Sequence, residues 1–159
     1  MNFLQIYTLI HVLISLVGIA SGFLVVFAML EAKSLPRLTA LFLVTTALTS
    51  ITGFFFPFKG ITPGIIIGIL SLLVLAPTFY ALYGKHLVGV WRKIYVITAV
   101  IALYFNTFVL IAQSFQKVPA LKALAPTGSE PPFAMAQGTL LIFVIILGIF
   151  AAKRFRPAI

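Results

Sequence analysis

The residues that could do chemistry in this chain are polar side chains placed inside long apolar stretches. His11 is the most informative of them, because a histidine within a membrane can relay protons, ligate haem or hold a quinone head group. Ser15, Gly18 and Gly22 follow His11 at offsets of four, seven and eleven residues. These offsets place the four residues on one face of a helix.

Amide and hydroxyl side chains add to this set. Asn106 and Gln113 lie seven residues apart, so they share a helical face, and Gln137 stands near the start of the last apolar stretch. We therefore predict a polar pocket lined by the first, second, fourth and fifth apolar stretches, with Glu130 at its mouth. The candidate ligand-binding residues are His11, Ser15, Thr49, Ser50, Asn106, Gln113 and Gln137. The alternative is that these groups only hydrogen-bond between packed helices, which contributes about 0.6–2 kcal/mol each and needs no ligand.

Catalytic signatures are missing, so we expect a non-catalytic protein with no catalytic residues and no metal site. The chain has two acids and two histidines, no cysteine, and no metalloprotease, nucleophile-elbow, phosphate-loop or dinucleotide motif. A proton relay through His11 would need a carboxylate within the membrane, and the five apolar stretches contain none. His86 lies in a connection on the opposite side of the membrane, so the two histidines cannot share a haem, and Met135 is the one candidate partner ligand. No cofactor is expected, with haem or quinone as the alternative.

The elements that position these residues are membrane helices. Hydrophobic residues make up 62% of the 159 residues and charged residues 8%, and the mean hydropathy is +1.22. A soluble domain of this size needs a polar exterior that such a composition cannot supply. We predict an all-α polytopic membrane protein, a single domain over 1–159 folded as a compact bundle of five transmembrane helices.

Five stretches are long enough to cross roughly 30 Å of hydrocarbon, which takes about 20 apolar residues. They cover residues 4–29, 38–56, 62–83, 90–114 and 133–152, and a short amphipathic segment at 118–125 lies in the longest connection. Pro77 falls inside the third stretch and should kink it.

Lysine and arginine set the predicted orientation. Basic residues flank the first and third connections and the C-terminal tail, whereas the opposite side receives Lys59, Lys117 and Lys122. We predict an inner (plasma) membrane protein with the N-terminus outside and the C-terminus in the cytoplasm. The net charge of +9 does not indicate nucleic-acid binding, because the charges sit at helix ends on both faces and form no contiguous stripe.

Small residues predict close helix packing. Gly18 and Gly22, and likewise Gly64 and Gly68, have the GxxxG spacing that lets helix backbones approach. Packing within one bundle explains both pairs, and a homo-oligomer or a partner subunit is the alternative.

His11 in the first stretch, together with the segment Phe115–Leu121 after the fourth, resembles small multi-span proteins of bacterial inner membranes. The resemblance implies a bacterial envelope setting and no activity. We expect an accessory subunit of a membrane complex or a binder of a small apolar or amphipathic ligand. A small transporter or proton-coupled carrier, and a haem- or quinone-binding redox subunit, are the alternatives.

Overall fold

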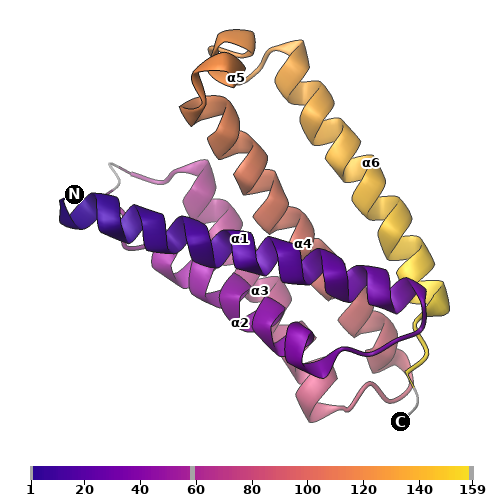
Figure 1. Cartoon of the computed structure of the whole chain (residues 1–159). Coiled ribbons are helices and arrows are strands. Elements are labelled where there is room, and N and C mark those ends of the chain that lie inside the picture. Colours follow the sequence, from indigo (N-terminus) through magenta and orange to yellow (C-terminus); the bar gives the residue numbers. More distant parts are fainter. Residues whose placement is uncertain (1, 58–59, 158–159) are drawn as a thin grey trace.

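The chain folds into helices throughout the part that the computed structural model describes, residues 2–57 and 60–157 (Figure 1). In chain order the elements are α1 (Phe3–Leu30), α2 (Pro36–Gly53), α3 (Pro63–Phe79), the π turn η1 (Tyr80–Gly84), α4 (Val90–Lys117), α5 (Pro119–Leu124) and α6 (Pro131–Arg154). The predicted all-α class is confirmed. Lys59, which the predicted orientation used, lies outside the described residues.

Among the described residues, four helices are long and apolar enough to cross a membrane, which indicates a membrane protein. They are α1, α3 continued by η1, α4 and α6. The predicted second span, 38–56, corresponds to α2, which is not among these four, so the count of five is not established. The reason is composition, since α2 carries Thr or Ser at six of its 18 positions and begins with Pro36 and Arg37.

The helix bounds agree with the predicted stretches to within a few residues. α2 ends at Gly53, so that Phe54–Phe56 lie beyond the helix, and α4 continues three residues past the predicted end, to Lys117. The third stretch is α-helical to Phe79 and then changes to the π turn η1. This change follows Pro77, whose ring removes a backbone N–H from the helical hydrogen-bond ladder.

The apolar core occupies one half of the bundle. α1 packs along α2, α3 packs along α4, and α6 packs on the outside against α4 and α1 (Figure 1). The most deeply buried apolar side chains come from the second half of α1, the first halves of α2 and α4, and the second half of α3. They include Val26, Met29, Phe42, Leu43, Leu75, Val96 and Leu103.

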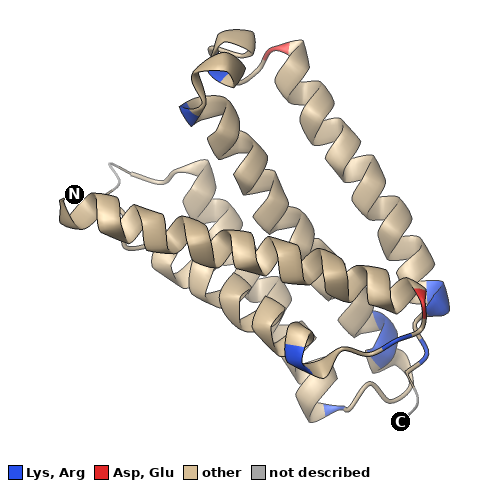
Figure 2. Ribbon diagram, viewed as in Figure 1, with Lys and Arg blue, Asp and Glu red and all other residues tan. Residues whose placement is uncertain are grey.

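Charged residues gather at the ends of the helices (Figure 2). The end of the bundle that holds the core also carries most of the basic residues, namely Lys33, Arg37, Lys85, Arg92, Lys93, Lys153, Arg154 and Arg156. Lys117, Lys122 and Glu130 lie at the other end, around α5. We refer to these as the basic end and the α5 end.

The first GxxxG pair lies where α1 meets its neighbours most closely. A Cβ atom built on Gly22 would lie 2.8 Å from Leu103 Cδ1 and 2.8 Å from Phe42 Cε2. At Gly18 it would lie 3.0 Å from Thr45 Oγ1 and 3.1 Å from Asn106 Nδ2. Both positions therefore bring α1 against α2 and α4.

The second pair is different. A Cβ atom on Gly68 would lie 3.0 Å from the ring of Phe54, at the end of α2. On Gly64 it would approach only Thr62 Oγ1, the cap of its own helix, at 3.7 Å. Within the described part of the chain, no atom of a neighbouring helix lies within 4 Å of this position, so the close packing predicted at Gly64 is not seen.

Candidate ligand-binding cavity

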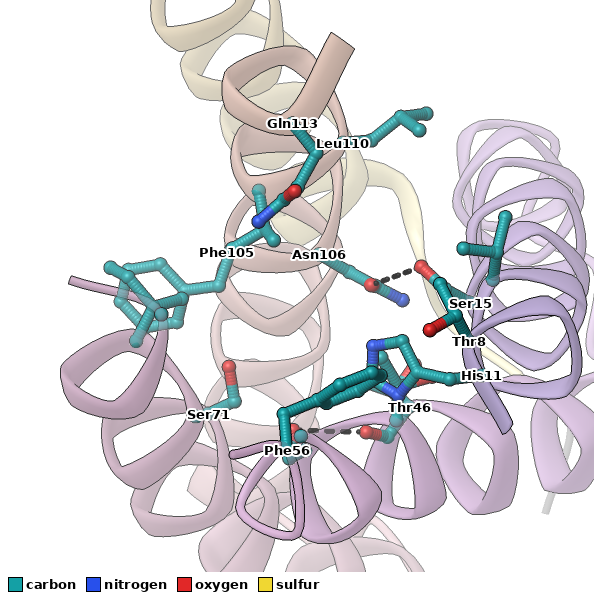
Figure 3. A pocket seen from close by; sticks show the side chains of 18 of the residues that line it. Thr8, His11, Ser15, Thr46, Phe56, Ser71, Phe105, Asn106, Leu110 and Gln113 are labelled. Carbon is teal, nitrogen blue, oxygen red and sulfur yellow. Dashed lines mark hydrogen bonds between the residues drawn. The ribbon is translucent and has the colours of Figure 1, made fainter. Parts of the chain in front are cut away.

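A cavity of about 380 Å³ lies between α1, α2, α3 and α4 in the half of the bundle nearer the α5 end (Figure 3). Helix α1 contributes residues 8–15, α2 residues 46–53, α3 residues 64–71 and α4 residues 105–117. The polar lining side chains are Thr8, His11, Ser15, Thr46, Thr49, Ser50, Ser71, Asn106, Gln113, Ser114 and Lys117. The structure thus has an apolar core at the basic end and a polar cavity toward the α5 end.

The structure brings most of the predicted site residues to this cavity. His11, Ser15, Thr49, Ser50, Asn106 and Gln113 all line it, and they come from three helices that are far apart in sequence, α1, α2 and α4. Gly64 and Gly68 line it as well.

Two predicted site residues lie elsewhere. The Gln137 side chain is buried between helices, where its Nε2 donates to the backbone oxygen of Phe108 at 3.1 Å, so it ties α6 to α4. Glu130 stands at the start of α6, and its carboxylate accepts from the backbone N–H groups of Thr127 and Ser129. The sequence predicts that the last helix lines the cavity together with α1, α2 and α4. In the structure α3 takes this place, because α6 packs on the outer side of α4.

His11 reaches from α1 toward α2, and its hydrogen bonds define its tautomer. Its Nδ1 lies 2.8 Å from Thr52 Oγ1. Thr52 Oγ1 already donates its proton to Leu48 O at 2.7 Å, so it acts as the acceptor toward His11. Nδ1 therefore carries the proton, and Nε2 of the neutral ring is a hydrogen-bond acceptor. The ring of Phe56 packs edge-on against the imidazole, with 5.0 Å between centroids.

Asn106 connects α4 to α1 across the cavity wall. Its Oδ1 accepts from Ser15 Oγ at 3.1 Å. Asn106 Nδ2 and Thr46 Oγ1 are buried without a hydrogen-bond partner among the described residues, and both lie near the position that a Cβ of Gly18 would take. Buried polar groups without partners are uncommon in folded proteins, so this wall retains hydrogen-bonding capacity that the chain itself does not use.

Most hydroxyl groups on the cavity wall are engaged by their own helices. Thr8, Thr49, Ser50 and Ser114 each donate to the carbonyl four residues earlier, at 2.8–3.0 Å. Ser71 differs, because it is 5% exposed and makes no hydrogen bond in the described part of the chain. Ser71 is not among the site residues predicted from the sequence. Its offsets of seven from Gly64 and three from Gly68 repeat the one-face pattern of His11–Gly22 and could have indicated it.

Lys117 is the charged residue of the cavity lining and lies at the end of α4. Glu130 does not neutralise it within the described residues, where the salt bridge found is the exposed pair Lys33–Glu31, at 2.6 Å. Hydrogen bonds from Thr127, first from its backbone N–H and also from its hydroxyl, together with the Ser129 N–H, lower the pKa of Glu130 to about 2.

The candidate haem ligands do not converge. Met135 lies on α6 with 69% of its surface exposed, and it is not part of the cavity wall that holds His11. His86 lies in the connection between η1 and α4, next to Lys85 of the basic end. Met135, the one candidate partner ligand under the haem alternative, does not line the cavity that holds His11, because α6 packs outside the four helices that surround His11.

Comparisons of this chain with protein families, with curated proteins and with solved structures find no match.

Proposed function

We propose that this protein binds a small amphipathic ligand inside the membrane, in the cavity between α1 and α4. The observation that carries the proposal is the two-sided lining of this cavity. Val12, Phe56, Ile67, Phe105, Val109 and Leu110 supply an apolar surface, and hydroxyl, amide and imidazole groups supply a polar one. Ligand sites in proteins commonly have this combination, with volumes of about 300–1,000 Å³.

Binding is favoured over catalysis by the charges at the site. The described lining contains one histidine and one lysine but no carboxylate. General acid–base chemistry works best with groups whose pKa values are set apart by their surroundings, and here a second such group is missing from the wall. The cavity is also closed toward the basic end by buried apolar side chains such as Phe42 and Leu103, which favours a binding site over a transport path.

The proposal includes α2 as a fifth span. Its 18 residues extend about 27 Å, close to the hydrocarbon thickness. Leu41, Val44, Leu48 and Ile51 form one exposed stripe along it, each 42–49% exposed, whereas Thr45, Thr46 and Ser50 are buried. A stripe of this kind suits contact with lipid, and the low average hydropathy of α2 comes from its inward face.

Five spans place the termini on opposite sides. Because the basic end then faces the cytoplasm, the N-terminus and the mouth of the cavity face outward, and the ligand enters from the outer leaflet. The inner membrane of a bacterium is the proposed location, in line with the resemblance noted above.

A variant in which a large side chain fills the cavity tests the proposed binding. Val109→Trp places a large ring in the cavity, whereas Val44→Trp makes the same change on the exposed face of α2. Protein isolated in a mild detergent and analysed by native mass spectrometry should carry a bound amphipathic molecule in the wild type and in Val44→Trp, and should lose it in Val109→Trp. Equal occupancy in all three proteins, or none in the wild type, would refute the proposal.

Cysteine labelling tests the topology, since the chain contains no cysteine of its own. With Asn2→Cys, a membrane-impermeant maleimide should label intact cells. With Arg156→Cys, it should label only after permeabilisation. Labelling of both positions in intact cells would mean an even number of spans and would place α2 outside the membrane.

A further inference from the structure

The hydrogen-bonding atoms left open in the less exposed part of the cavity wall indicate the head group of the ligand, an inference that rests on the proposed function. Gln113 and Lys117 also line the cavity, but both are exposed and lie toward the end of α4. His11 and Ser71 face the cavity from α1 and α3, on different sides of it (Figure 3). One of these residues offers an acceptor and the other a donor. The other hydroxyl groups of the lining either donate a hydrogen bond within the protein, as those of Thr49 and Ser50 do, or are fully buried, as that of Thr46 is.

The acceptor is His11 Nε2. Because Thr52 Oγ1 donates to Leu48 O, it takes its hydrogen bond from Nδ1–H of His11 and thereby fixes the tautomer. No other group of the described chain donates to Nε2. A ligand that fills the cavity must then offer a donor at this point, because a buried acceptor left without a partner is unfavourable.

The donor is the hydroxyl of Ser71. Serines in helices commonly return this proton to the carbonyl four residues earlier, and Ser50, Ser21 and Ser114 do so here. Ser71 makes no such bond, and its oxygen is not among the buried, sealed atoms that include Thr46 Oγ1. Its proton is therefore available to an acceptor in the cavity.

We infer that the ligand has a neutral head group bearing a hydroxyl. A hydroxyl is both donor and acceptor, so it can donate to His11 Nε2 and accept from Ser71, either with one oxygen or with two oxygens on one head group. A carboxylate offers acceptors only and would face the lone pair of Nε2. Acylglycerols and quinols share the required chemistry on an apolar carrier.

Paired ligands test this inference without altering the protein. Native mass spectrometry of the full chain is carried out with monolauroylglycerol, its dimethyl ether, laurate, a decyl-substituted benzoquinol and the matching quinone. The hydroxyl-bearing member of each pair should bind about 10- to 100-fold more tightly, the range expected when one buried hydrogen bond is lost. Preference between monolauroylglycerol and the quinol separates the two sources of the hydroxyl.

A matched pair of serine variants locates the effect. Ser71→Ala should weaken monolauroylglycerol binding about tenfold. Ser21→Ala should leave it unchanged, because Ser21 is equally buried, lies outside the cavity and already donates to Val17 O at 2.6 Å.

The outcomes separate the two proposals. Equal binding of alcohol and ether, or tightest binding of laurate, would overturn the hydroxyl inference and leave the proposed binding function intact. If no probe binds, and the wild type carries no more ligand than Val109→Trp, both proposals fail.

Discussion

The closest contact between helices gives the sharpest prediction about stability. A Cβ atom on Gly22 would stand 2.8 Å from both Leu103 Cδ1 and Phe42 Cε2, and these two side chains are 1% and 0% exposed. Neither can move into free space, so Gly22→Ala forces the core at the basic end to shift. Overpacking of this kind destabilises by about 1–3 kcal/mol.

Gly138→Ala is the matched control. Gly138 lies in α6, and a Cβ there would meet nothing within 4 Å. Gly138→Ala therefore causes no overpacking and changes only the conformational freedom of the helix backbone. We expect this to stabilise the fold by about 0–1 kcal/mol, a small value because membrane helices stay largely helical when they separate. The two variants should therefore differ in their free energy of unfolding by about 1–4 kcal/mol.

The assay is unfolding by sodium dodecyl sulfate in mixed micelles, followed by near-UV circular dichroism and repeated at two protein concentrations. Gly22→Ala should unfold at a lower detergent fraction than the wild type, and Gly138→Ala at an equal or higher one. If Gly22→Ala is as stable as Gly138→Ala, the close contact of α1 with α2 and α4 is absent, and so is the arrangement that surrounds the cavity.

Two further predictions concern the ends of the bundle. Carbon-13 NMR of the Glu130 carboxyl should give a pKa of about 2, and Thr127→Val, which removes one hydrogen bond to the carboxylate, should raise it toward the ordinary glutamate value. Since folding lowers the pKa of Glu130, the carboxylate stabilises the fold above the unfolded pKa of about 4.3, and this stabilisation is lost as the pH falls toward 2. A pKa at the ordinary value would contradict the hydrogen bonds from Thr127 and Ser129 to this carboxylate. Arg92 Nη1 donates to the backbone oxygens of Phe155 and Ala152, so Arg92→Gln should destabilise the fold by about 1–3 kcal/mol and expose the C-terminus to carboxypeptidase. Unchanged digestion would show that this contact does not hold the tail.

Some of the architecture could be predicted from local sequence because its causes are local. The length of the apolar stretches determines that the chain is helical and that four helices can cross a membrane. Pro36, Pro63, Pro119 and Pro131 stand at helix starts, where a missing N–H has no consequence. Periodicity also places His11 with Ser15, and Asn106 with Gln113, on shared faces that line one cavity.

What could not be predicted is how the helices are arranged around one another. Helical periodicity identifies a polar face but says nothing about which helix it meets. Gln137 was assigned to the pocket for this reason, although it bonds to Phe108 O on the outer side of α4. Ser71 was missed for the same reason, since a single serine in an apolar helix becomes informative only when α3 is known to close the cavity.

The hydrogen bonds of α2 bear on the alternative that the polar residues only join helices. Of the five hydroxyl side chains between Thr45 and Thr52, four donate to carbonyl groups of α2 itself. Thr46 makes no hydrogen bond. Within the described residues, Thr52 is the one of these five whose hydroxyl also hydrogen-bonds to another helix, through its bond with His11. If helix association were the main role of these residues, their protons would be directed at α1 and α3. Because four of the five are satisfied within α2, they add polarity to the cavity without filling it. Two groups that are less exposed than Gln113 and Lys117, namely His11 Nε2 and Ser71 Oγ, are left for a molecule from outside the chain.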